Sequence, residues 1–167
     1  MKIAATTLAL MLTMAAHAGA RPATAPRNAC EVLTRTDMAK VQGEAWSDVR
    51  LSNRGETSQC FYQLPSFVNS VSLDLTRGDA RQIWRERFEA EEEEEGEQGK
   101  KKKKKKHPPA PVQGIGDEAF WVGNHMTGSL YVLKGDALLR VSIGGKGTEQ
   151  EKIAKSKTLV RKALKRL

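Results

Sequence analysis

Few side chains in this chain could carry out chemistry, and the most specific of them are two cysteines. Cys30 and Cys60 are an even pair, which in an oxidising compartment predicts a disulfide. The bridge would close a loop of about 30 residues and stabilise the fold by roughly 3–4 kcal/mol. Two free, buried thiols are the alternative, and only a free thiol could act as a nucleophile.

The remaining candidates for catalysis favour structural roles. Asp117 and Glu118 are adjacent carboxylates, but neighbouring residues of a strand point to opposite faces of a sheet. The glycines of Gly114-Ile115-Gly116 lack the strand before and helix after that a phosphate-binding loop requires, so we expect them to allow a tight entry into the next strand. No metal-ligand spacing or hydrolase motif is present. We therefore expect no enzyme, no cofactor and no metal.

Three tryptophans could line a binding groove. Trp46, Trp84 and Trp121 are large enough to fill the core of a small domain, and that is the competing interpretation. Trp121 lies just before a predicted hairpin loop that holds His125 and Met126, and loops often carry function. We therefore take Trp121, His125 and Met126 as the hypothetical binding face.

Charge suggests a second kind of partner. The chain has 28 lysines and arginines against 20 acidic residues, a net charge of +8. Seven glutamates fall in residues 89–97, seven lysines occupy 100–106, and a basic helix is predicted at the C-terminus. These could hold a polyanion or a membrane surface, whereas a domain-closing helix with solvated lysines is the alternative. Nucleic acid is disfavoured, because no aromatic side chain is interleaved with the lysines to stack bases. The candidate polyanion contacts are Lys100, Lys103, Lys106, Lys155 and Lys162.

The N-terminus has the pattern of a cleaved signal peptide. Residues 1–18 combine Lys2, an apolar stretch and the sequence Ala16-His17-Ala18, which fits signal peptidase cleavage after Ala18; cleavage after Ala20 also fits. A buried N-terminal helix is the alternative. Residues 19–29 form a flexible leader in this interpretation. No lipid-modified cysteine is predicted, so we expect a soluble periplasmic or secreted protein without a transmembrane segment.

The rest of the chain alternates between helical and strand periodicity. We predict one α+β domain over 30–167, in the order α-βββ-α-βββ-α, with an antiparallel sheet of about six strands and the helices on one face. A charged low-complexity insertion, expected to be a solvated loop, occupies 89–111. The predicted helices are 31–41, 80–89 and a last one capped by Thr148 and running to about 166, and the predicted strands are 46–51, 59–64, 71–75, 118–122, 129–133 and 139–143.

Three stretches resemble a known group of proteins. Cys30-Glu31-Val32-Leu33, Cys60-Phe61-Tyr62 and the segment Gly114-Ile115-Gly116-Asp117-Glu118-Ala119-Phe120-Trp121 are similar to uncharacterised bacterial cell-envelope domains. That family includes small actinobacterial lipoproteins and extracellular sensor domains of receptor-type protein kinases. The resemblance implies an α+β sandwich outside the cytoplasm, a bridge between the two cysteines and no catalytic residues. The chain departs from the family in lacking a lipidation cysteine and in carrying the charged insertion.

These observations favour an exported, non-catalytic binding or interaction module whose partner is an unknown envelope ligand or protein. A polyanion or membrane-surface binder is the first alternative, and a hydrolase with an unrecognised site is the second. The sequence does not specify the ligand or the oligomeric state.

Overall fold

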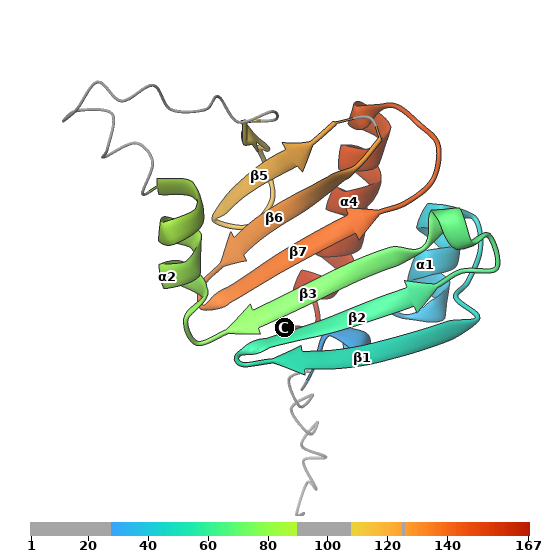
Figure 1. The fold of residues 1–167 in the computed structure, drawn as a ribbon, viewed down its shortest axis with the longest axis horizontal. Helices are drawn as coiled ribbons and strands as arrows, with labels where there is room; N and C mark the ends of the chain where they lie inside the picture. The colour runs from blue at the N-terminus through green and yellow to red at the C-terminus, as the bar shows by residue number, and fades with distance from the viewer. Residues whose placement is uncertain (1–27, 90–107, 125) are drawn as a thin grey trace, which may run out of the picture.

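The computed structural model describes residues 28–89, 108–124 and 126–167. They form one antiparallel sheet whose seven strands lie in the order β1-β2-β3-β7-β6-β5-β4 (Figure 1). The predicted α+β class is confirmed. The strand count of about six was too low, because Ala110 and Pro111, inside the segment predicted as a loop, pair with β5. The strands are β1 (Asp48–Arg54), β2 (Thr57–Gln63), β3 (Val71–Arg77), β4 (Ala110–Pro111), β5 (Glu118–Gly123), β6 (Gly128–Lys134) and β7 (Ala137–Ile143).

The sheet consists of two meanders that meet in its centre. β1, β2 and β3 follow one another along the chain and in space, as do β5, β6 and β7, and β3 pairs with β7. Two-residue turns close β1–β2 at Gly55 (φ 55°) and β6–β7 at Gly135 (φ 58°). A glycine with positive φ in the first turn position matches the twist of the flanking strands.

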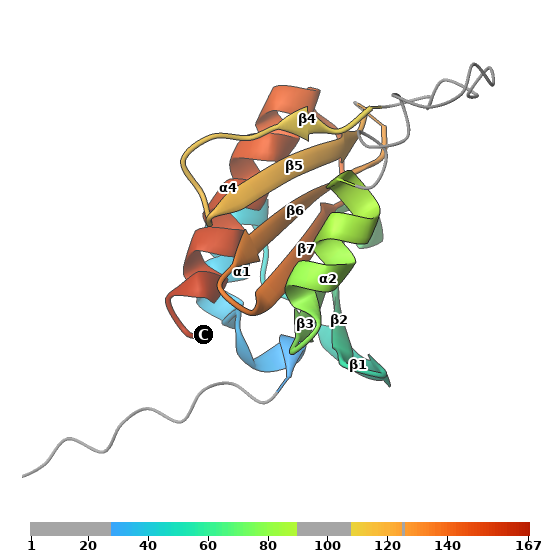
Figure 2. The ribbon, with the colours of Figure 1, turned by 90° about the vertical axis from the view of Figure 1, so that its left-hand side faces the viewer.

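The helices cover both faces of the sheet, which corrects the prediction that they lie on one face. The short η1 (Ala29–Glu31), α1 (Arg35–Gln42) and α4 (Glu149–Leu164) pack on one side. α2 (Ala80–Trp84) continues into a π-helical segment, η3 (Arg85–Glu89), on the opposite side (Figure 2). We call the first side the covered face. Among the described residues no helix has the length and apolar character needed to cross a membrane.

Strand alternation separates the two sides. On β7, Leu139, Val141 and Ile143 point into the main core beneath α1 and α4, while Leu138 belongs to a second core beneath α2. The same period of two places Leu130 and Val132 of β6 in the main core. The fully buried large side chains are Trp84, Trp121, Tyr62, Met38, Leu64, Leu73, Leu75, Leu130, Leu133, Leu139, Leu159 and Val32.

The helix ends follow from short-range capping. Thr34 caps the start of α1 and forms a capping box with Asp37; Gly43 ends the helix with φ 85°. Thr148 and Glu151 form the predicted capping box of α4. One lysine of α4 is not solvated as the sequence predicted. Lys152 is 3% exposed, and its Nζ donates to the Met126 carbonyl at 3.0 Å.

The predicted disulfide between Cys30 and Cys60 is present, with their Cα atoms 5.0 Å apart. It joins η1 to β2, and the Tyr62 hydroxyl donates to the Ala29 carbonyl at 2.8 Å beside it. Burial raises the pKa of Tyr62, so the phenol keeps its proton. Ala29 is fully buried, and Asn28 caps η1. Asn28 and Ala29, which the sequence predicted to be part of a flexible leader, therefore pack as part of the fold.

An aromatic cluster attaches α2 to the sheet. Ala80 and Trp84 are buried, and Ile83 and Phe88 pack against them. The Phe88 ring lies 4.5 Å from the Trp84 ring and 5.0 Å from that of Phe120 on β5. This cluster covers only the β5–β6–β7 end, and no helix of the described residues covers the remainder of that side of the sheet.

Candidate binding surface on the open face of the sheet

The structure buries one residue of the hypothetical binding face, Trp121, and exposes another, Met126. Trp121 is 1% exposed and lies in the main core, where its ring fills the space beside Gly128. Met126 in the hairpin loop is 71% exposed, and His125 lies outside the described residues. The prediction for Trp121 overlooked strand parity, which turns its indole toward α4 rather than toward solvent.

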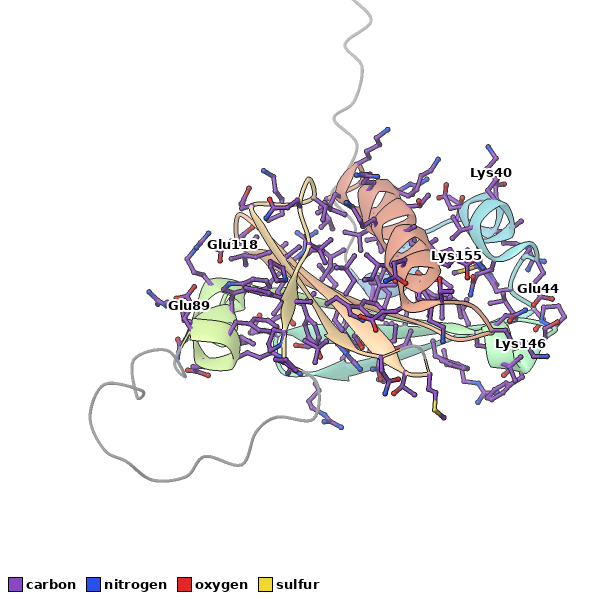
Figure 3. All side chains as sticks on the ribbon, turned by 90° about the horizontal axis from the view of Figure 1, so that it is seen from above. Lys40, Glu44, Glu89, Glu118, Lys146 and Lys155 are labelled. Carbon is purple, nitrogen blue, oxygen red and sulfur yellow. A yellow bond between two sulfur atoms is a disulfide. The ribbon has the colours of Figure 1, made fainter. Side chains whose placement is uncertain are left out.

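Two of the five candidate polyanion contacts, Lys155 and Lys162, lie in the described part of the chain. Lys100, Lys103 and Lys106 lie outside the described residues. Lys155 is exposed on α4, on the covered side of the molecule (Figure 3). The Nζ of Lys162 lies 3.6 Å from the Asp37 carboxylate of α1.

Cations of α4 and of the residues just after it hold the fold together. Asp37 is 5% exposed, and its Oδ2 forms an ion pair with Arg166 Nη2 at 2.7 Å. Burial alone would raise the pKa of Asp37, but hydrogen bonds from Thr34 and the Arg166 guanidinium together hold it below its usual value. Lys157 donates to the Gln113 carbonyl at 2.6 Å. The basic helix therefore closes the domain, as the alternative interpretation of its sequence predicted.

The adjacent carboxylates are engaged in structural contacts. Asp117 accepts hydrogen bonds from the Gly135 amide and the Lys134 ammonium, each at 2.7 Å, and these lower the pKa of its carboxyl. Glu118 accepts the Trp84 indole N–H at 2.9 Å. Gly116 (φ 64°) has no room for a Cβ, which would collide with Val132, so it permits the predicted tight entry into β5. Within the described part of the chain, no group of carboxylates, histidines and cysteines could hold a metal.

The surface that remains is the side of the sheet that α2 covers only at one end, here called the open face (Figure 1). A row of side chains crosses it in register from strand to strand. Ser52 of β1 is opposite Gln59 of β2, which is opposite Asp74 of β3. Asp74 is opposite Arg140 of β7, and Arg140 is opposite Tyr131 of β6. We call these five residues the central row.

Hydrogen bonds fix the central row. The Gln59 amide donates to Asp74 Oδ1 at 2.8 Å, and Arg140 Nη1 donates to Asp74 Oδ2 at 2.9 Å. The Arg140 guanidinium lies 5.8 Å from the centre of the Tyr131 ring. Burial alone would lower the pKa of Arg140, but Asp74 and Tyr131 raise it, so the cation is retained. Arg87 of η3 closes the end of the row, where its Nη2 donates to the Tyr131 hydroxyl at 2.6 Å.

A second row, the serine row, runs beside the first. It consists of Phe61 on β2, Ser72 on β3, Ser142 on β7 and Ser129 on β6, opposite one another in that order. The hydroxyl oxygens of Ser129 and Ser142 are 2.6 Å apart. Phe61 is partly exposed and its ring lies 6.0 Å from that of Phe67. The serine row therefore consists of small hydroxyl side chains with a phenyl group at its β2 end.

The open face is hollowed near the sheet edge. A depression of about 310 Å³ lies over β1, β2 and β3. Its walls can donate and accept hydrogen bonds, and its acidic group is already paired with Arg140. The sequence carried one signal of this surface, the alternation of Ser72, Asp74 and Thr76 with apolar residues along β3, but it did not predict a binding site there. The lining residues are Ser52, Asn53, Arg54, Thr57, Gln59 and Asp74.

Comparisons with known proteins add no functional assignment. No model of a protein family matches this chain, and no curated protein matches it significantly. Among solved structures, a GTP-binding regulator from Thermotoga maritima is similar with 14% identity, over 76% of this chain and 87% of its own. The TM-score is 0.35, which is too low to support any argument about this protein.

Proposed function

We propose that this chain is an exported, non-catalytic binding module whose open face takes a neutral, hydroxyl-rich ligand such as an envelope oligosaccharide. The observation that carries the proposal is the central row, a hydrogen-bonded line of polar side chains on five adjacent strands. Side chains held by their neighbours are preorganised, so binding a ligand costs little additional ordering.

The charge state of the row favours a neutral ligand. Asp74 is 17% and Arg140 36% exposed at the side chain, and each offsets the charge of the other. A strongly anionic ligand would have to compete with Asp74 for the guanidinium. A sugar hydroxyl both donates and accepts hydrogen bonds, and it can contact the remaining edges of Asp74 and Gln59 without breaking their bond.

The serine row supports the same class of ligand. Ser72 and Ser142 are partly exposed, and their small side chains leave room for a ligand above the sheet. Phe61 offers an apolar ring at one end of the row, which suits the C–H face of a sugar. The combination of a few oriented polar groups with an aromatic surface is typical of small-molecule sites.

Export is part of this proposal. The signal-peptide pattern of residues 1–18 and the resemblance to cell-envelope domains support it, and a disulfide persists in an oxidising compartment. Intact mass of the protein recovered from the cell envelope tests it. A chain beginning at Gly19 or Arg21 and lighter by two hydrogens than its reduced form is expected; an uncleaved chain with two thiols would contradict export.

The ligand class can be tested by calorimetric titration with a panel of defined neutral oligosaccharides and a matched anionic series. We expect binding to at least one neutral member, and Gln59→Ala and Ser142→Trp should each weaken it about tenfold or more, through a lost hydrogen bond or a blocked surface. Lys155→Gln, on the covered side, is the matched control and should bind as the unmodified protein does.

Salt separates this proposal from the polyanion alternative. Neutral binding should persist from low to moderate ionic strength, whereas binding through exposed lysines should collapse. Binding that responds to Lys155→Gln and to salt, but not to Gln59→Ala, would assign the function to the basic surface. Turnover of ester, peptide or glycan substrates would instead favour the hydrolase alternative.

A further inference from the structure

The two edges of the sheet are very different. The β4 edge is two residues long and includes Pro111, which has no N–H to donate. The β1 edge is seven residues long, and all seven are exposed. A long exposed edge presents unpaired backbone groups and can accept another strand.

The phase of the β1–β2 hairpin identifies those backbone groups. The two-residue turn after Arg54 makes Arg54 and Thr57 a hydrogen-bonded pair. Every second residue from Arg54 therefore directs its N–H and C=O toward β2. The alternate residues, Val49, Leu51 and Asn53, direct theirs outward from the edge. Val49 and Leu51 are also 39% and 46% exposed.

The sequence of β1 is complementary to itself in an antiparallel arrangement. When Leu51 of one strand faces Leu51 of a second copy, Val49 faces Asn53, so the outward-directed backbone groups of both strands meet. The same register sets Asp48 of each copy opposite Arg54 of the other. The full length of both strands overlaps, and opposite charges meet at both ends.

Neighbouring registers are disfavoured by charge. A shift of two residues in one direction places Arg50 opposite Arg54, and the same shift in the other direction places Arg50 opposite Arg50. Like charges directly opposite each other on paired strands are destabilising. Charged residues on an edge strand usually discourage pairing with other chains. Here Asp48, Arg50 and Arg54 favour the register centred on Leu51 over its neighbours.

We propose that a second copy of this chain pairs with β1 across a two-fold axis centred on Leu51, which extends the sheet through both subunits. The Leu51 side chains meet on the covered side, and the Asp48–Arg54 pairs lie on the open side. The interface is one strand wide, so the dimer is reversible and depends on protein concentration. It brings the two open faces side by side and does not depend on what they bind.

Charge reversal and restoration test this pairing. Asp48→Arg alone sets arginine opposite arginine, and Arg54→Asp alone sets aspartate opposite aspartate. Sedimentation equilibrium of the full, disulfide-bonded chain over a wide concentration range should show dimerisation weakened about tenfold or more in each single variant. The double variant D48R/R54D restores opposite charges and should recover the dimer.

Hydrogen exchange provides an independent readout of the register. Raising the protein concentration should protect the amides of Val49, Leu51 and Asn53, while those of Arg50 and Ser52 are already bonded to β2 and should change little. A protein that stays monomeric at every concentration would overturn the proposal. So would a dimer in which the two single variants and the double variant associate equally well.

Discussion

The two faces of this sheet are built from the same strands but have opposite properties. On the covered face, alternate residues are apolar and packed beneath α1 and α4; on the open face they are serines, a carboxylate, an amide and a guanidinium. β3 illustrates both, because Leu73 and Leu75 are buried while Asp74 between them joins Gln59 and Arg140. We therefore expect substitutions on the covered face to change stability and substitutions on the open face to change ligand binding.

Truncation in the covered face should have the largest effect. Trp121→Ala removes a fully buried indole, and we expect the free energy of unfolding to fall by about 3–5 kcal/mol. The matched change on the open face, Ser142→Ala, removes a hydroxyl that lies 2.6 Å from that of Ser129, and we expect a loss of only about 0.5–1.5 kcal/mol. Denaturant titration of both variants measures the contrast. Equal losses would show that the two faces do not differ as the structure implies.

The bridge between η1 and β2 should come next. Replacing Cys30 and Cys60 together by serine removes the cross-link, and we expect a loss of about 3–4 kcal/mol. Thermal unfolding with and without reductant provides the measurement. The unmodified protein should lose stability on reduction and the double variant should not; a stability unaffected by reductant in both would contradict a structural bridge.

The buried carboxylate beneath α4 should have a smaller, pH-dependent effect. Asp37→Asn removes the charge that Arg166 faces, and we expect a loss of about 1.5–3 kcal/mol at neutral pH. Because the pKa of Asp37 is lowered in the folded protein, its contribution is fully present above the unfolded value of about 3.9 and disappears as pH falls through the folded value. Stability measured against pH should therefore converge for the two proteins in acid. A constant difference down to acid pH would assign the loss to packing instead of charge.

Substitution in the central row should have a similarly small effect on stability. Gln59→Ala removes a partly exposed amide that donates to Asp74, and we expect the free energy of unfolding to change by about 0.5–1.5 kcal/mol. Ligand affinity should respond more strongly than stability. A fall in stability comparable to that of Trp121→Ala would place Gln59 in the structural part of the molecule.

Much of the fold followed from local patterns. Thr148 and Glu151 marked the start of α4, and alternation in residues 71–75 and 139–143 marked two central strands. These signals are short-range and physical, since a cap or an alternation acts within a few residues. The disulfide was predictable for a similar reason, because only two cysteines are present.

The arrangement of faces could not be read in the same way. Whether a helix covers one side or the other depends on tertiary packing, so α2 was placed with the other helices although Trp84 packs on the opposite side. The central row depends on registers between β1, β2, β3, β7 and β6, which combine residues from Ser52 to Arg140. Lys152 shows the same limit, because its carbonyl partner at Met126 lies in a distant hairpin.

Binding on the open face can be tested by chemical-shift mapping. The protein is titrated with a neutral oligosaccharide from the panel, and the shifted amide signals locate the bound surface. If the ligand binds the open face, the amide signals of Gln59, Ser72 and Ser142 should shift together at both low and moderate salt. The amide signal of Lys155, on the covered side, should not shift. Shifts confined to α4, or shifts that disappear as salt is added, would contradict a binding surface on the open face.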